Sequence, residues 1–123
     1  MCNKIYEFDP KIYPQRLWVS VGAKKEDLVE FEDVSEMNDY AIATTTPIVN
    51  KAKNKGGVLI RFRSKKDMTL SIVAHESTHA AMCILDYVGV EFDAENQEPV
   101  AYMIGWIAEC IDKVKRGKLT SNE

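Results

Sequence analysis

The densest apolar segment of the chain lies between residue 64 and Gly89, and it limits the possible folds more than any other feature. Ser64 or Asp67 can cap a helix at its start, and glycine is a common residue just after a helix end. Apolar side chains would cover most of the surface of such a helix: Leu70, Ile72, Val73, Ala74, Ala80, Ala81, Ile84, Leu85 and Val88. We therefore predict a helix that runs to about Val88 and is largely buried.

The first predicted helix can be buried by a second helix and by several strands that pack against it. The second helix is predicted from near Asn96 to about Lys115, ending at Gly117. Strand-like segments occupy 6–8, 17–21, 41–50 and 58–63, and a short surface helix is predicted over 24–31. The fold class is therefore α+β, in which a small antiparallel or mixed sheet packs on the two helices.

The last two strands are predicted to form a hairpin. A turn signal at 53–57, which includes two consecutive glycines, separates the segments 41–50 and 58–63. Pro47 indicates an edge position or a break in the first of them. Alternation in the second places Val58, Ile60 and Phe62 on one face and Leu59, Arg61 and Arg63 on the other.

Length and charge exclude several classes of protein. The chain has 123 residues, so we expect one domain over 1–123 with a frayed tail at 117–123. The net charge is −3, from 16 basic and 19 acidic residues, so nucleic-acid binding is not expected. No apolar run approaches the roughly 18 residues of a membrane span, and the N-terminal residues do not resemble a signal peptide. We therefore expect no membrane association and a cytoplasmic location.

The three cysteines, Cys2, Cys83 and Cys110, are expected to be reduced and mostly buried.

The motif that indicates chemistry is His75-Glu76-Ser77-Thr78-His79, an HExxH sequence within the first predicted helix. Residues four apart lie on one face of a helix, so the two imidazoles can bind a single Zn²⁺ at ~2.0–2.1 Å. Glu76 is rotated by about 100° from His75, so its carboxylate can accept a proton from a zinc-bound water. These are the only two histidines, and within an apolar helix unpaired polar groups would cost free energy. The alternative is a pair of ordinary hydrogen-bonded histidines.

A catalytic zinc site needs a third protein ligand. Cys83 is one turn beyond His79, but three ligands on one straight helix spread over about 12 Å, so Cys83 is assigned to packing. Asp86 and Asp93 lie near the end of the helix. Glu95 and Glu98 lie at the start of the second helix, which can fold back on the first. We favour Glu98, with Glu95 as the alternative.

Together these residues resemble the gluzincin branch of zincin metallopeptidases. The resemblance rests on the HExxH motif and on Glu98-Pro99-Val100-Ala101-Tyr102, which is similar to a segment of short zincin-like proteins from bacteriophages and mobile elements. It covers about 58–112 and implies a strand, an active-site helix and a glutamate helix. It also implies that 58–63 is the sheet edge along which a peptide lies, with Arg61 or Arg63 facing the cleft.

The expected function is a zinc-dependent hydrolase, a metallopeptidase acting on a peptide or protein, with Glu76 as general base. Tyr102 lies one turn after Glu98 and could donate a hydrogen bond to the oxyanion of a tetrahedral intermediate, or it could be a core tyrosine. The alternative function is a zincin-fold module, weakly active or inactive, that binds a protein partner. It is suggested by the short chain, which has no room for a second lobe. A metal-free protein with a chance motif is a third possibility.

Overall fold

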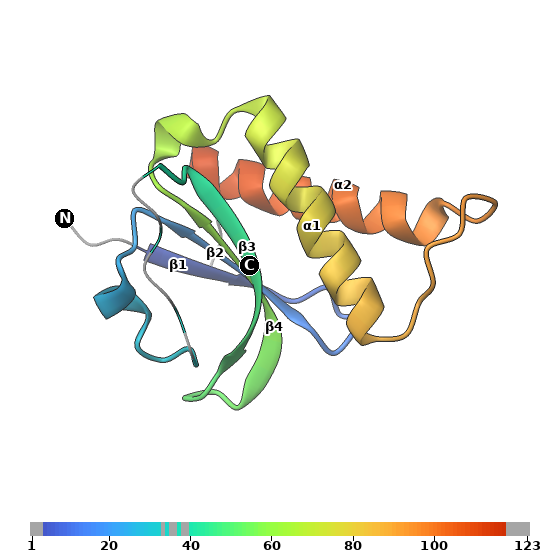
Figure 1. Ribbon diagram of the computed structural model, residues 1–123, viewed down its shortest axis with the longest axis horizontal. Coiled ribbons are helices and arrows are strands. Elements are labelled where there is room, and N and C mark those ends of the chain that lie inside the picture. Colours follow the sequence, from blue (N-terminus) through green and yellow to red (C-terminus); the bar gives the residue numbers. More distant parts are fainter. Residues whose placement is uncertain (1–3, 33, 35–36, 38–39, 118–123) are drawn as a thin grey trace.

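The computed structural model describes residues 4–32, 34, 37 and 40–117. Two helices pack on a four-stranded mixed sheet, which confirms the predicted α+β class (Figure 1). The elements, in chain order, are β1 (Lys4–Phe8), β2 (Arg16–Val21), the 3₁₀ helix η1 (Lys25–Leu28), β3 (Ala43–Asn50), β4 (Lys55–Phe62), the 3₁₀ helix η2 (Lys65–Asp67), α1 (Leu70–Tyr87) and α2 (Glu98–Arg116).

The strands lie in the order β1-β2-β4-β3. The predicted hairpin is confirmed, because β3 and β4 pair antiparallel, while β2 pairs with β4 in parallel. Gly57 faces Arg16 in that parallel pair, and a Cβ atom at Gly57 would lie 2.0 Å from the Arg16 carbonyl oxygen. The missing side chain therefore lets β2 approach. As a result β4 is a central strand, and the expectation that 58–63 forms the sheet edge is wrong.

The strand at that edge is β3. Pro47 lies within it, opposite Val58, where its missing N–H costs no hydrogen bond on the open side. This confirms the edge position that Pro47 predicted.

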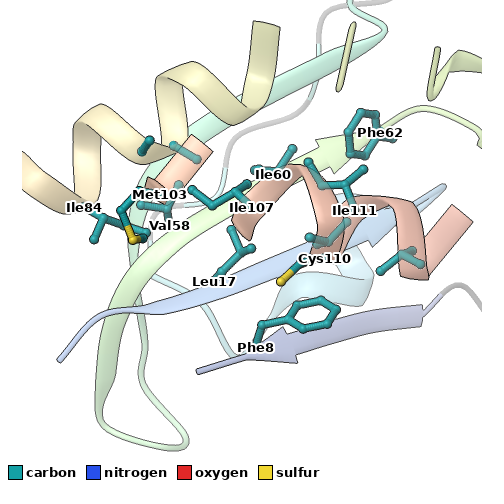
Figure 2. Close-up of a cluster of buried hydrophobic side chains, with 14 of the residues drawn as sticks. Phe8, Leu17, Val58, Ile60, Phe62, Ile84, Met103, Ile107, Cys110 and Ile111 are labelled. Atoms are coloured by element: carbon teal, nitrogen blue, oxygen red, sulfur yellow. The ribbon is translucent and has the colours of Figure 1, made fainter. Parts of the chain in front are cut away.

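The main core lies between the sheet and the two helices, which cover the same face (Figure 1). Helix α1 lies against β3 and β4, and α2 lies against β2 and α1. Figure 2 shows the apolar side chains that fill this layer. The labelled residues are Phe8, Leu17, Val58, Ile60, Phe62, Ile84, Met103, Ile107, Cys110 and Ile111, all of them buried.

A smaller cluster covers the opposite face of the sheet. Trp18, Leu28, Phe31 and Leu59 are buried together there, and the Trp18 and Phe31 rings meet edge to face at 5.1 Å. Arg61 shares this face with Leu59 by strand alternation and is 6% exposed. The expectation that Arg61 or Arg63 faces the cleft is therefore wrong for Arg61. Arg63 forms an ion pair with Asp67 at 3.1 Å.

The helix boundaries differ slightly from those predicted. Thr69 caps α1, where its hydroxyl accepts the Ile72 N–H, because Ser64 and Asp67 belong to the preceding turn and bond to each other. Gly89 follows α1 with a positive φ of 82°, as predicted for a helix stop.

The helical prediction over 24–31 reduces to η1, and Leu28 and Phe31 are both buried. Helix α2 ends at the left-handed Gly117, and the predicted frayed tail beyond it lies outside the described residues. Within the described residues, neither helix is long and apolar enough to cross a bilayer.

Candidate metal centre

His75 and His79 lie one turn apart on the solvent-exposed side of α1. Their Nε2 atoms are 3.2 Å apart, and their rings meet at 77° with centroids separated by 4.7 Å. The buried side of the helix is formed by other residues: Glu76, Ser77, Ala80, Ala81, Ile84 and Leu85. The expectation that burial of the two histidines costs free energy is therefore wrong, because both are exposed. The expectation holds for Glu76, which is buried.

The separation of the two nitrogens fits shared coordination of one metal ion. Two nitrogens at ~2.0–2.1 Å from a tetrahedral Zn²⁺ are about 3.3 Å apart, and the observed distance is 3.2 Å. The same distance also fits a direct hydrogen bond in which one imidazole donates and the other accepts. Since both rings are exposed, an ion can reach the pair from solvent.

Glu76 lies to the side of this pair, as its position in the helix predicts. Its side chain is 7% exposed and faces β3, where the Thr45 hydroxyl donates a hydrogen bond to Oε1. No other donor to the carboxylate is present among the described residues.

Neither of the predicted third ligands joins the histidines. Glu98 is exposed in the first turn of α2, and Glu95 is exposed in the preceding loop. Among the described residues, no group of three or more His, Cys, Asp or Glu side chains is arranged to hold a metal ion. The structure thus brings together His75 and His79, and it leaves both glutamates apart from them.

Tyr102 and Cys83 were the other residues considered near the site. Tyr102 is 67% exposed, so the interpretation as a core tyrosine is wrong. Cys83 is half-buried against the core, as predicted for a packing residue. Burial, with a smaller contribution from Asp86, raises the pKa of the Cys83 thiol, which disfavours the thiolate that binds zinc. Cys110 is buried and carries a reduced thiol, and Cys2 lies outside the described residues.

Sequence reasoning missed two features of this region. Thr45 carries no motif and lies 31 residues before Glu76. The second feature is an open hollow of about 360 Å³ between α1, the following loop and α2. It is lined by Met82, Phe92, Asp93, Ala94, Gln97, Val100, Ala101 and Ile104. Several of these lining residues are apolar and lie on the helices. The sequence pattern predicts that such residues are buried, so it does not indicate an open hollow.

No family model, no curated protein and no solved structure matches this chain.

Proposed function

We propose that the protein is a zinc-dependent hydrolase, a metallopeptidase of minimal zincin-like fold that acts on a peptide or protein. The observation that carries the proposal is the 3.2 Å separation of the His75 and His79 Nε2 atoms on an exposed helical face. Two exposed histidines gain little stability from each other, whereas this spacing suits a shared zinc ion.

Glu98 is proposed as the third ligand, and Glu95 remains the alternative. Among the described residues, the Glu98 carboxylate takes part in no hydrogen bond or ion pair, so it can reorient without breaking any. Its place in the first turn of α2 favours a carboxylate, because the N-terminal end of a helix dipole is positive.

The chemistry divides between the ion and the side chains. Bound Zn²⁺ would supply Lewis acidity, which acidifies water and polarises the scissile carbonyl. Glu76 takes the proton of the attacking water at Oε2, the carboxylate oxygen that Thr45 does not bind, and delivers it to the leaving amine. Tyr102, exposed one turn beyond Glu98, donates a hydrogen bond to the developing oxyanion.

The first experiment measures metal in the purified full-length protein by elemental analysis and by titration of the metal-stripped protein with Zn²⁺. We expect one zinc per chain in the wild type, and loss of tight binding in His75→Ala, His79→Ala and Glu98→Gln. The matched control is Glu109→Gln, which removes another exposed carboxylate of α2. Loss of zinc in Glu95→Gln but not in Glu98→Gln would move the third ligand to Glu95. A wild-type protein that binds no zinc would refute the proposal.

The second experiment tests hydrolysis with a library of internally quenched peptides. Glu76→Gln should retain one zinc per chain but lose turnover, because the amide cannot accept the proton. Hydrolysis that survives this substitution would exclude Glu76 as the general base.

A second candidate function is a zincin-fold module that binds a protein partner without cleaving it. It is favoured by the open hollow between the helices, where Met82 and Phe92 are 39% and 49% exposed. The same library of quenched peptides distinguishes the hydrolase from the binding module. Zinc-loaded protein that cleaves no peptide supports the binding module.

A further inference from the structure

The general base of the proposed site is attached to the edge strand of the sheet. Thr45 lies on the helix-facing side of β3, because it pairs with Ile60, whose side chain is in the core between sheet and helices. From there its Oγ1 donates to Glu76 Oε1 at 2.5 Å and lies 3.4 Å from the Glu76 carbonyl oxygen. This one hydroxyl therefore links the edge strand to the helix that carries both histidines.

Only one of the two carboxylate oxygens of Glu76 accepts this hydrogen bond from Thr45. The Thr45 hydroxyl donates to Oε1, while Oε2 receives no hydrogen bond from the described residues. Because the side chain is 7% exposed, few water molecules can replace the hydroxyl if it is lost. The contact therefore fixes the rotation of the carboxylate and determines which oxygen can reach a substrate water.

We propose that Thr45 is a positioning residue that orients the Glu76 carboxylate for proton transfer. The proposal rests on the proposed hydrolase function. Thr45 acts through Glu76 and does not touch the metal or the substrate. Proton transfer requires the base within about 2.6–3.2 Å of the proton-bearing oxygen, and a misplacement of about 1 Å can cost about a hundredfold in rate.

The test compares three threonine variants in the zinc-loaded, full-length protein on the best peptide from the quenched library. Thr45→Val removes the hydroxyl but keeps the shape of the side chain. We expect kcat to fall about tenfold to a hundredfold, with KM changed by less than about threefold and one zinc still bound. Thr45→Ser retains the donor and should keep kcat within about threefold of the wild type. Thr46→Val is the matched control, because Thr46 is exposed and lies on the opposite side of the same strand.

The outcomes separate the two proposals. A wild-type kcat in Thr45→Val overturns the role of Thr45 and leaves the hydrolase intact. Equal losses in Thr45→Ser and Thr45→Val, or in Thr46→Val, also overturn it, because a loss of packing or of strand geometry would then explain the effect. If Thr45→Val does not fold, Thr45→Ala takes its place with the same expectation. A wild-type protein without hydrolysis overturns both proposals.

Discussion

Replacing Glu7 with glutamine should destabilise the protein at neutral pH and have little effect in acid. Glu7 lies on β1 and is the acceptor for the Trp18 indole N–H at 3.0 Å and the Lys53 ammonium at 2.8 Å. It also pairs with Arg16 at 3.2 Å and Lys55 at 3.6 Å. One carboxylate thus joins β1, β2 and the β3–β4 hairpin.

The loss of stability expected in Glu7→Gln depends on how exposed the Glu7 carboxylate and its cationic partners are. The Glu7 side chain is 25% exposed and its three cationic partners are 24–50% exposed, so solvent screens each pair. Such pairs contribute about 0.2–1 kcal/mol each, and three of them contribute about 1–2 kcal/mol. Glutamine still accepts the indole N–H, so that bond is retained. With an unfolding entropy of about 2.1 cal/mol/K per residue, the melting temperature of this chain should fall by about 4–8 °C.

The shifted pKa of Glu7 determines how the stability difference between wild type and Glu7→Gln changes with pH. Burial alone would raise the pKa of Glu7, but hydrogen bonds from Lys53 and Trp18, with the charges of Lys53 and Lys55, lower it below its ordinary value of 4.5. A carboxyl group whose pKa is lower in the folded state stabilises the protein above the unfolded pKa. That contribution is lost as the pH falls through the folded pKa. The difference between wild type and Glu7→Gln should therefore be complete at pH 7, begin to shrink below about pH 5 and vanish in stronger acid.

Urea unfolding at a series of pH values from 7 to 3 measures this difference directly. The control is Glu91→Gln, which removes an exposed carboxylate from the loop after α1 and should change the free energy of unfolding by less than about 0.5 kcal/mol. The reasoning is refuted if Glu7→Gln is as stable as the wild type at pH 7. It is also refuted if the difference stays constant down to pH 3, because the loss would then not come from the charge.

Three further predictions concern the metal and two glycines. Zinc at about a hundred times its dissociation constant should stabilise the wild type by about 2.7 kcal/mol and raise its melting temperature by about 10 °C. Differential scanning fluorimetry should show no such rise in His75→Ala, and an equal rise there would exclude His75 as a ligand. Gly57→Ala should destabilise the protein by about 3 kcal/mol, because its Cβ would meet the Arg16 backbone; unchanged urea unfolding would contradict this. Gly105→Ala should stabilise α2 by up to about 1 kcal/mol, because a Cβ there meets no atom within 4 Å; a loss of stability would show an unseen contact.

The parts of the fold that the sequence predicted are those with local signals. The turn signal at 53–57 predicted the β3–β4 hairpin, although the turn itself occupies 51–54 and residues 55–57 already belong to β4. Gly89 and Gly117 marked the ends of the two helices. The order of the strands has no such signal, because β2 and β4 are far apart in the chain and pair in parallel. Gly57 permits this pairing, yet in the sequence it is indistinguishable from an ordinary turn residue.

The histidine pair was predictable because helical spacing alone brings residues four apart together. The exposure of that pair was not, because small residues such as Ala74 make the outer face of α1 resemble a buried one. The choice of a third ligand for the proposed zinc site depends on how α2 returns beside α1 and on the rotation of an exposed carboxylate. Neither is encoded by local spacing, which is why Glu95 and Glu98 could not be separated from the sequence.

The partner of Glu76 illustrates how far sequence reasoning extends. Residues 44–46 are three consecutive threonines, and alternation along a strand directs the middle one to one face and its neighbours to the other. Only the pairing of Thr45 with Ile60 establishes which face that is, since a slip of one residue would direct Thr44 and Thr46 toward the helix instead. The register of the hairpin therefore determines which hydroxyl meets the buried carboxylate. For this reason Thr46→Val is an informative control: it removes the same hydroxyl one position along the strand, where the observed register leaves it in solvent.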